Sequence, residues 1–461
     1  MREKMRDLWT SQEADEVIRG ISSEPWGCSG ISIDSRTLEK GDLFVALKGE
    51  TGDGHAFLHE VIKKGAAAAL VSETIEVSLP FLRVEDTLKA LEKLGIAARD
   101  RCSAHRIAVT GSVGKTSTKD MLKWVFKDQG QTHGSISSYN NHWGVPLTLA
   151  RMPQGTQFAI FEVGMSHAGE IRPLSQMIKP NIALVTTVVE AHSEFFKSTE
   201  DIARAKAEIF EGMVRGGAVL LNRDNPHFEL LSMLAQEQGL SVFCFGESKN
   251  VDYRLLSWEG EAEKSKIIAE IGGEKISYVL PVPGLHWALN SLPVLGAVAL
   301  LGADIKQAAH SLETVKAPSG RGKRYKGDFV IIDESYNANP TSMRAALAVL
   351  GQSGKGRKIA VLGDMRELGE LSRKHHEELL NPLLENKIDQ VFCCGPYMAY
   401  LYEQLPGSMK GGYAPTSLEL ISGIVKAIEP GDVISVKASL GTKAKPIVEA
   451  LLDLQKNSLR R

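Results

Sequence analysis

The stretch Thr110-Gly-Ser-Val-Gly-Lys-Thr-Ser117 follows an apolar run, Ile107–Val109, and precedes a segment with helical periodicity. A strand therefore leads into a glycine loop that opens a helix. Backbone N–H groups at such a helix N-terminus converge on an anion, and the helix dipole favours negative charge there. Lys115 can reach a terminal phosphate, and the Thr116 hydroxyl can hold Mg²⁺. We predict an ATP site built from Thr110, Gly111, Ser112, Val113, Gly114, Lys115, Thr116 and Ser117.

One position departs from the phosphate-loop pattern. Gly-x-x-x-x-Gly-Lys-Ser/Thr would place a glycine at position 109, where this chain has Val109. The strand, loop and helix nevertheless follow in the order that the pattern requires. An ordinary glycine-rich turn is the alternative, but it gives no reason for Lys115 followed by Thr116.

Length and composition limit the classes of protein that fit. A chain of 461 residues corresponds to about three domains of about 150 residues each. The net charge of -2 offers no field for nucleic acid or an anionic membrane. No apolar stretch of about 18 residues or signal-peptide core is present, so we expect a cytoplasmic chain without membrane insertion, acting as a monomer. The five cysteines form no C-x-x-C pair and no even set, which indicates reduced, buried thiols.

Hydrophobic periodicity predicts an α/β protein of three domains. Residues 1–104 are expected to form a small α/β domain. Over residues 105–316 apolar strands mostly alternate with longer helical patterns, which is typical of a parallel sheet with crossover helices, here phosphate-loop ATPase-like, with a β excursion over 246–276. A predicted linker, 317–324, opens the third domain, 317–461, which is expected to be a Rossmann-like open sheet.

Polar side chains stand where two predicted strands end. Glu162 ends the run Phe158–Phe161, and His192 follows the predicted strand Ile182–Val189. Ligands gather at the carboxyl ends of strands in open α/β sheets, so both side chains can face the phosphate loop. Alternatively, the carboxylate caps a helix and the histidine is an ordinary hydrogen-bonding residue. Lys206, judged by its pattern alone, is one solvated position on an amphipathic helix.

A third polar cluster follows an apolar strand near residue 331. The run Asp333-Glu-Ser-Tyr-Asn337 continues into Ala-Asn339-Pro340, and the proline can begin a helix. Turn chemistry explains the last two residues but not the preceding polar run. We therefore expect this turn to meet a ribose or the edge of an adenosine.

These motifs, together with Gly284-Leu-His286, Asn290 and Arg321, resemble in order and spacing the Mur ligases of bacterial peptidoglycan synthesis. The resemblance spans nearly the whole chain. Within that family, four stretches are most similar to members that join D-alanyl-D-alanine to UDP-N-acetylmuramoyl-tripeptide: 138–149, 190–196, 333–340 and 362–369.

The resemblance implies a reaction in which ATP phosphorylates a peptide carboxylate and an amine then attacks the acyl phosphate. It also implies domain closure before this chemistry, with nucleotide and incoming dipeptide bound by the C-terminal domain. The catalytic residues it implies are Lys115, Lys206 and His192. The resemblance implies two metal ions: Thr116 and Glu162 would hold one Mg²⁺, and His192 would hold a second ion with the help of Lys206 as a carbamylated lysine.

Further binding residues follow from the same resemblance. Those expected around the nucleotide are Asn290, Arg321, Asp333 and Asn337. Those expected to bind the UDP-linked substrate are Ser35, Arg36, Lys48, Asn140 and Asn141. Trp287 stands where many members have asparagine, so the resemblance does not decide which residues contact the adenine. The stretch Val436–Thr442 departs from the family pattern, so it does not decide the contacts to the incoming dipeptide either.

Three alternatives remain at this point. The chain could be the preceding ligase that adds the third residue of the stem peptide, or a folylpolyglutamate-type synthase with the same ATP machinery. It could also be a nucleotide-dependent switch or binding protein. The carboxylate, histidine and lysine outside the phosphate loop argue against the last alternative.

Overall fold

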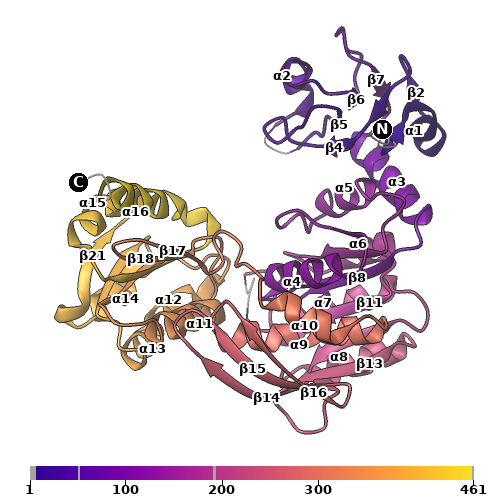
Figure 1. The fold of residues 1–461 in the computed structure, drawn as a ribbon. Helices are drawn as coiled ribbons and strands as arrows, with labels where there is room; N and C mark the ends of the chain where they lie inside the picture. The colour runs from indigo at the N-terminus through magenta and orange to yellow at the C-terminus, as the bar shows by residue number, and fades with distance from the viewer. Residues whose placement is uncertain (1–6, 50–51, 191–193, 459–461) are drawn as a thin grey trace.

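The computed structural model describes residues 7–49, 52–190 and 194–458. Three α/β modules follow one another along the chain (Figure 1). The N-terminal module lies above the middle module, and the C-terminal module lies to one side of it. The predicted α/β fold is thus confirmed. The three main sheets lie within 1–104, 105–316 and 317–461, although the boundaries themselves stay predictions.

The N-terminal module is a small sheet with helices against it. All residues of its two central strands are buried, as expected for strands covered on both faces. The sheet is parallel except for β2. Its strands, in spatial order, are β2 (Ile21–Ser22), β7 (Phe81–Arg83), β6 (Ala68–Val71), β5 (Asp42–Val45) and β4 (Gly30–Ser32). The accompanying elements are α1 (Ser11–Ile18), η1 (Gly54–Phe57), α2 (Leu58–Lys63) and the paired strands β1 (Trp9–Thr10) and β3 (Gly27–Cys28).

Helix packing joins this module to the middle one. Helix α3 (Thr87–Asp100) packs along α5 (Gly144–Ala150). The indole of Trp9 donates a 2.8 Å hydrogen bond to the carbonyl of Ala150, and Arg151 Nε donates to the carbonyl of Ile31 at 2.5 Å. The N-terminal sheet is therefore anchored to the middle module through backbone carbonyls as well as apolar packing.

The middle module contains a nine-stranded sheet. It is parallel from β9 to β14 and antiparallel over its last three strands, which confirms the predicted β excursion. Its strands, in spatial order, are β16 (Glu274–Leu280), β15 (Ser265–Ile271), β14 (Tyr253–Gly260), β13 (Ser241–Gly246), β12 (Ala218–Asn222), β11 (Ile182–Val185), β8 (His105–Thr110), β10 (Phe158–Glu162) and β9 (Thr132–Gly134).

Strand β11 is shorter than its apolar pattern predicts. It ends at Val185, although the N–H of Thr186 still donates to the carbonyl of Thr110 at 3.0 Å. Beyond Val185, Thr186 and Thr187 also contact the glycine loop. The Thr186 hydroxyl donates to the carbonyl of Val113 at 2.6 Å, and the N–H of Ser112 donates to the carbonyl of Thr187 at 2.8 Å. The residues after Val185, which were predicted to continue the strand, thus support the glycine loop.

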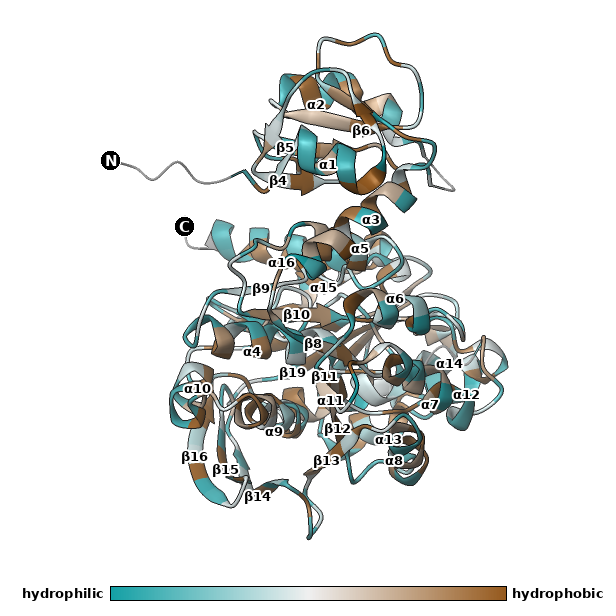
Figure 2. Cartoon of the chain, turned by 90° about the vertical axis from the view of Figure 1, so that its right-hand side faces the viewer, coloured by the Kyte–Doolittle hydropathy of each residue, from teal (hydrophilic) through white to brown (hydrophobic). Residues whose placement is uncertain are grey.

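Two apolar cores cover the faces of this sheet. One contains α4 (Lys115–Lys127), α9 (Leu285–Leu300) and α10 (Ile305–Leu312). Helix α9 is hydrophobic along most of its length (Figure 2), as a helix buried on nearly all sides must be. The other core contains α5, α6 (Ile171–Ile178), α7 (Thr199–Ala207), η2 (Glu208–Gly212) and α8 (Phe228–Glu237).

The C-terminal module is the predicted open sheet with helices on both faces. It is parallel except for its edge strand β17, which begins inside the predicted linker, so the linker prediction is wrong at its last two residues. The strands are β17 (Lys323–Lys326), β18 (Val330–Glu334), β22 (Val433–Lys437), β19 (Lys358–Gly363), β20 (Gln390–Cys394) and β21 (Lys410–Ala414). The helices are α11 (Pro340–Gly351), η3 (Gly369–Leu371), α12 (Ser372–Glu377), α13 (Leu380–Glu385), α14 (Met398–Gln404), η4 (Gly407–Met409), α15 (Ser417–Ala427), η5 (Leu440–Thr442) and α16 (Lys445–Ser458).

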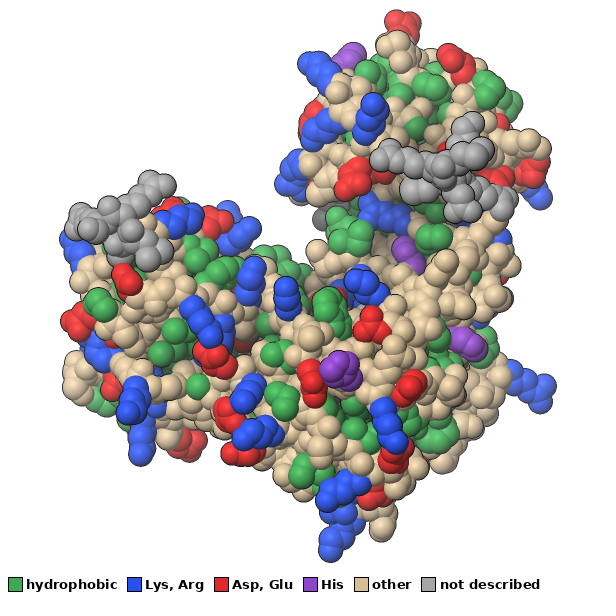
Figure 3. Space-filling model, in the orientation of Figure 1, with side chains coloured by type: hydrophobic (Ala, Val, Ile, Leu, Met, Phe, Trp, Pro, Cys, Tyr) green, Lys and Arg blue, Asp and Glu red, His purple; other side chains and the backbone are tan. Residues whose placement is uncertain are grey.

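The surface is hollowed between the N-terminal and C-terminal modules, above the middle one (Figure 3). Among the described helices, none combines the length and apolar composition that a membrane span requires. All five cysteines carry free thiols; four are buried, as predicted, and Cys244 is partly exposed.

Candidate active site between the middle and C-terminal modules

A cavity of about 540 Å³ lies where the carboxyl ends of the middle-module strands meet the C-terminal module. We call it the interdomain cavity. Its walls come from the glycine loop, the loop after β9, the start of α9, the segment after α10, and the ends of β18 and β22. The predicted site residues that line it are Ser112, Val113, Gly114, Lys115, Thr116, Ser117, Asn140, Asn141, Glu162, Asn290, Arg321 and Asn337.

The glycine loop has the backbone geometry of an anion site. Helix α4 begins at Lys115, and its N-cap Gly114 has φ 84° and no side-chain cap, so the first N–H groups of the helix are open to a ligand. A Cβ on Gly114 would come within 2.6 Å of Asn290 Nδ2. At Gly111, with φ 146°, a Cβ would lie 1.9 Å from the Thr186 hydroxyl. Both glycines are therefore required by close approach as well as by conformation.

Lys115 turns back onto its own loop. Its Nζ donates to the carbonyl of Gly111 at 2.7 Å. Burial lowers the pKa of the Lys115 amine, and nearby Arg321 lowers it further, while Glu162 opposes both effects. An anionic ligand would favour the charged amine in the same way as Glu162 does.

Glu162 is a buried carboxylate with one oxygen occupied and one free. Its side chain is 1% exposed, and Oε1 accepts a 2.8 Å hydrogen bond from Asn140 Nδ2. Oε2 has no hydrogen-bond partner among the described residues. A buried carboxylate oxygen is costly to leave unpaired, and a hard cation would satisfy it. Thr116 lines the same cavity, and its hydroxyl would offer such a cation a second oxygen ligand.

The small number of metal-binding side chains in the cavity wall fits Mg²⁺ better than a metal whose ligands all come from the protein. Within the described part of the chain, no three His, Cys, Asp or Glu side chains cluster closely enough to form a metal site. Mg²⁺ usually takes only one or two carboxylates and completes its shell with water and phosphate oxygens. His192, the further ligand that the sequence predicts, lies outside the described residues.

Lys206 is buried on α7 and does not line the interdomain cavity. Its side chain is 2% exposed, so the interpretation of a solvated surface lysine is wrong. Burial lowers the pKa of the Lys206 amine well below its ordinary value, and the positive charge of Lys115 lowers it further. Among the described residues, no carboxylate pairs with this amine. The helical pattern misled because it places Lys206 on the polar side of an isolated helix, whereas the fold buries this side chain near Lys115.

Asp333 and Glu334 differ in what they face. Asp333 is 3% exposed and accepts hydrogen bonds from the N–H of Gly320 at 2.8 Å and from the Ser335 hydroxyl at 2.6 Å. Asp333 therefore holds the turn that carries Arg321, and it does not line the cavity. Glu334 lines the cavity instead and pairs with Lys437 at 3.3 Å.

Arg321 reaches from the segment between the modules toward the glycine loop. Its guanidinium lies 4.1 Å from the centre of the Tyr336 ring, and its Nη2 donates to the Ser138 hydroxyl at 3.3 Å. Stacking on the ring holds the flat guanidinium in place while its other N–H groups stay available to an anion. The cavity thus receives cations from both modules.

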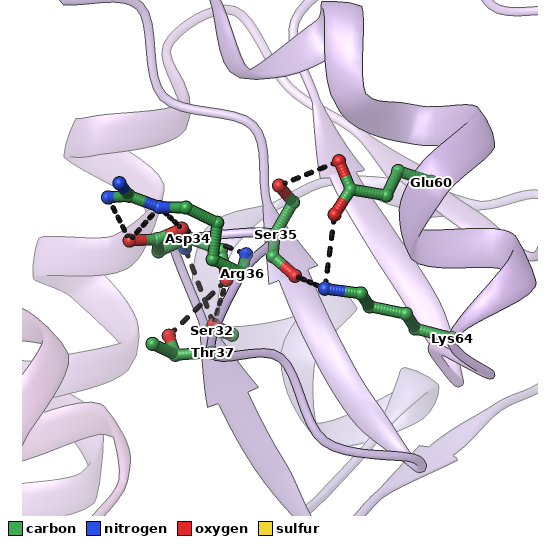
Figure 4. Close-up of polar contacts among 7 residues, drawn as sticks. All are labelled: Ser32, Asp34, Ser35, Arg36, Thr37, Glu60 and Lys64. Carbon is green, nitrogen blue, oxygen red and sulfur yellow. Dashed lines mark hydrogen bonds and ion pairs between the residues drawn. The ribbon is translucent and has the colours of Figure 1, made fainter. Parts of the chain in front are cut away.

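The predicted substrate residues of the N-terminal module, Ser35, Arg36 and Lys48, do not line the interdomain cavity and are engaged with carboxylates. Figure 4 shows the contacts of Ser35 and Arg36. Arg36 pairs with Asp34 at 2.7 Å, although its side chain is 84% exposed. Ser35 donates from its hydroxyl to Glu60 at 3.1 Å. Lys48 pairs with Glu73 at 2.5 Å.

Comparison with known proteins agrees with this arrangement. The sequence matches the Mur ligase family, catalytic domain, over residues 28–115, the Mur ligase middle domain over 109–298, and the Mur ligase glutamate ligase domain over 320–440. The UDP-N-acetylmuramoyl-tripeptide--D-alanyl-D-alanine ligase of Rickettsia prowazekii (strain Madrid E) is 35% identical over 96% of this chain and 99% of its own length. The chain belongs to the Mur ligase family.

Solved structures place the same fold among Mur ligases. MurF from Acinetobacter baumannii superposes with a TM-score of 0.84 at 28% identity and covers 97% of this chain and 99% of its own. MurF ligase from Thermotoga maritima in complex with ADP gives a TM-score of 0.77 at 25% identity, with 93% and 98% covered. The family resemblance read from the motifs is therefore confirmed.

The geometry of this Mur ligase also brings to the cavity four residues that lie in the motifs quoted above but were not predicted individually as site residues. Ser138, Glu334, Tyr336 and Lys437 all line the cavity. Lys437 ends an apolar strand, so the rule that ligands gather at strand ends would have found it. Ser138 opens the stretch 138–149, but its place in the cavity depends on the fold of a loop and was not predicted.

One of the positions at which this Mur ligase departs from the family pattern, Trp287, is also part of the cavity wall. Trp287 is 5% exposed and lines the cavity next to His286. Burial lowers the pKa of His286. A neutral imidazole and an indole therefore stand side by side in this part of the cavity wall.

Proposed function

We propose that this chain is an ATP-dependent amide ligase that adds D-alanyl-D-alanine to UDP-N-acetylmuramoyl-tripeptide through an acyl phosphate, in cytoplasmic peptidoglycan precursor synthesis. The observation that carries the proposal is the interdomain cavity, which joins a phosphate loop, the free oxygen of Glu162 and a guanidinium from the next module. The name of the Rickettsia prowazekii relative supports the choice of substrates. Because all the proposed residues come from one chain, a monomer suffices.

Charge neutralisation is the first task of this site, since both ATP and the peptide carboxylate are anions. The loop N–H groups, Lys115 and Arg321 supply it. The carboxylate oxygen forms a bond to the γ-phosphorus as the bond from that phosphorus to the ADP oxygen breaks. The amine of the dipeptide then attacks the acyl carbon, phosphate leaves, and the amine loses a proton to complete the amide. The ADP in the Thermotoga maritima structure supports an adenine nucleotide at this site.

Thr116 and Glu162 would hold one Mg²⁺, and His192 would hold a second metal ion. Bound there, the ions would shield the charge of the phosphate oxygens during transfer. Asn140 orients Glu162 so that its second oxygen is presented to the cavity.

Lys206 is proposed to act as a carbamate. Burial favours its neutral amine, which is the form that combines with CO₂. Addition of the amine nitrogen to the carbon of CO₂, with loss of one proton, replaces a cation by an anion. The carbamate would then be attracted to Lys115 instead of repelled by it, and could help to hold the second metal ion.

The remaining cavity residues are proposed to bind the nucleoside. Asn290 and Asn337 offer amide groups, while Trp287 and His286 offer ring faces to the adenine. Glu334 lines the cavity and can accept hydrogen bonds from the ribose hydroxyls, so we assign ribose binding to Glu334. Asp333 would support the site by holding the turn at Gly320.

The substrate is proposed to span two modules. Ser35, Arg36 and Lys48 would exchange their present carboxylate partners for the UDP pyrophosphate. Tyr139 packs against the N-terminal core, and its neighbours Asn140 and Asn141 line the interdomain cavity. This loop therefore offers a path for the peptide from the nucleotide sugar toward Glu162, and closure of the modules would exclude water from the acyl phosphate.

The deciding experiment is an acceptor screen. Purified protein with ATP, Mg²⁺ and UDP-N-acetylmuramoyl-tripeptide is given D-alanyl-D-alanine, single amino acids or no amine, and products are identified by mass spectrometry. Only the dipeptide should yield a UDP-linked pentapeptide with ADP and phosphate. Parallel reactions with the UDP-linked dipeptide plus diaminopimelate or lysine, and with folate plus glutamate, test the related ligases. Product in one of those reactions alone would overturn the proposal, as would ATP hydrolysis that ignores every acceptor.

A further inference from the structure

The phosphate-loop helix carries a buried lysine that the proposed chemistry does not use. Lys119 lies on α4, is 1% exposed, and pairs with Asp120 at 2.7 Å. Its Nζ also donates to the carbonyl of Ser137 at 2.9 Å. A buried ammonium group is tolerated only when ion pairs or hydrogen bonds replace its hydration, and here its hydrogen bonds go to backbone carbonyls of a loop. Lys119 therefore fixes this loop against the helix.

A second lysine on the same helix strengthens this attachment. Lys123, one turn after Lys119, donates to the carbonyl of Ser135 at 3.2 Å and to that of Gly134 at 3.4 Å. Ser137, whose carbonyl accepts from Lys119, has φ 50°, a left-handed conformation that few non-glycine residues adopt. Such a conformation persists where surrounding contacts enforce it, and it frequently occurs at functional sites.

The next residue, Ser138, links the two sides of the interdomain cavity. Its hydroxyl oxygen lies 3.3 Å from the Thr116 hydroxyl of the glycine loop and 3.3 Å from Nη2 of Arg321. The first partner belongs to the middle module, and the second lies in the segment that leads into the C-terminal module. This loop thus places the Ser138 hydroxyl between Thr116, a proposed metal ligand, and Arg321, a proposed phosphate ligand.

The hydrogen-bonding capacity of a serine hydroxyl decides what this arrangement can do. Such a group accepts two hydrogen bonds and donates one, whereas a guanidinium can only donate. When the Thr116 oxygen binds a cation, the Thr116 hydroxyl must donate its proton to another group, and the Ser138 oxygen lies 3.3 Å away. Thr116 and Arg321 then fill both acceptor positions of Ser138. The Ser138 proton remains for an anion, and Ser138 lines the cavity.

We propose that Ser138 is a positioning residue for the phosphate end of the nucleotide, holding Thr116 and Arg321 in register across the two modules. Lys119 acts behind it by fixing the loop. This inference rests on the proposed function, because it assumes that a nucleotide phosphate and a cation occupy the cavity.

The test is the affinity of the full chain for ADP, measured by calorimetry with and without Mg²⁺. Ser138→Ala should weaken ADP binding about tenfold in the presence of Mg²⁺, as expected for loss of a hydroxyl that orients charged partners, and much less in its absence. Ser138→Thr keeps the hydroxyl and should restore binding. Ser166→Ala removes another hydroxyl from the same cavity wall and should leave the affinity unchanged.

A double-mutant cycle distinguishes positioning from general damage. If Ser138 acts through Arg321, Ser138→Ala should have little further effect in an Arg321→Ala background. Lys119→Met should reproduce the Mg²⁺-dependent loss; circular dichroism and thermal unfolding show whether this variant folds, and Ser138→Ala carries the test if it does not.

Equal ADP affinity of Ser138→Ala and the unaltered chain, or equal losses with and without Mg²⁺, would overturn the inference. Additive effects of the Ser138 and Arg321 substitutions would overturn it as well. A failure of the proposed function is distinguishable, because it would show as absence of pentapeptide from the unaltered chain in the acceptor screen.

Discussion

Asn140 donates its side-chain amide to Oε1 of Glu162 at 2.8 Å, which fixes a buried carboxylate with its second oxygen unpaired. Groups that orient a metal ligand typically contribute about 10- to 100-fold to metal affinity. Replacing Asn140 with alanine should therefore raise the Mg²⁺ concentration needed for half-maximal ligase activity by about that factor. The measurement is a Mg²⁺ titration of phosphate release. An unchanged midpoint in a folded variant would remove Asn140 from the metal site, and Ser166→Ala serves as the matched cavity control.

Lys115→Ala should be nearly inactive yet folded. Loss of a preorganised group at a developing charge costs about 10²- to 10³-fold in rate, and the buried amine contributes no hydrophobic packing that the fold requires. Phosphate release and circular dichroism measure the two effects. The control is Lys127→Ala at the far end of α4, whose side chain is exposed, and it should retain full rate. Comparable activity of both variants would refute the role given to Lys115.

Lys206→Ala should lose ligase activity and recover part of it when short carboxylates are added, because these can replace the carbamate anion. Lys206→Arg should be inactive and not rescued, since a guanidinium fills the pocket without forming the carbamate. Labelled bicarbonate offers a direct check through a carbamate carbon signal in NMR that Lys206→Arg lacks. Full activity of the alanine variant without additives would exclude Lys206 from the mechanism.

Gly111→Ala should destabilise the middle module and abolish nucleotide binding. The new methyl group would meet the Thr186 hydroxyl at 1.9 Å, and φ 146° is unfavourable for alanine. We expect a loss of several kcal/mol in the free energy of unfolding, on the order of 3 kcal/mol. Gly169→Ala is the matched control: its φ of 89° is also positive, but no atom lies within 4 Å of the new methyl, so only about 1 kcal/mol should be lost. Urea unfolding of both variants decides, and equal losses would refute the steric explanation.

His376 should make the C-terminal module sensitive to acid. Its Nδ1–H donates to the carbonyl of Ser372 at 2.6 Å, and its Nε2 accepts from the N–H of Met365 at 2.9 Å, so the neutral ring satisfies both partners. Burial lowers the pKa of His376 from 6.5 to about 4. Between these values the unfolded chain binds a proton that the folded chain does not. Stability should therefore fall as the pH drops from about 6.5 to about 4, by up to about 3 kcal/mol for this group.

Urea unfolding at several pH values measures this effect. His376→Gln should be less stable at neutral pH but should lose less stability on acidification than the unaltered chain. His310→Gln, with an exposed ring on α10, should follow the unaltered chain at every pH. A His376→Gln variant with the same pH dependence as the unaltered chain would show that another group is responsible.

Much of the fold could be predicted because local patterns report local structure. The apolar runs that became β8, β10, β12 and β13 alternate with helical stretches, and this order alone favours parallel sheets with crossover helices. The edge strand β17, Lys-Arg-Tyr-Lys, was not predicted, because edge strands tolerate charge and lack the apolar pattern. The end of β11 was misplaced because the chain after Val185 leaves regular strand pairing where Thr186 and Thr187 bond to the glycine loop.

The sequence by itself determined the glycine loop at the start of α4, the position of Glu162 at a strand end and the polar run after β18, because each depends on residues adjacent in the chain. Only the tertiary structure decided that Lys206 is buried, that Glu334 and not Asp333 faces the cavity, and that Ser138 stands between Thr116 and Arg321. These facts depend on strand register and on contacts between residues far apart in the chain. Packing of whole modules sets such contacts, and no local pattern encodes it.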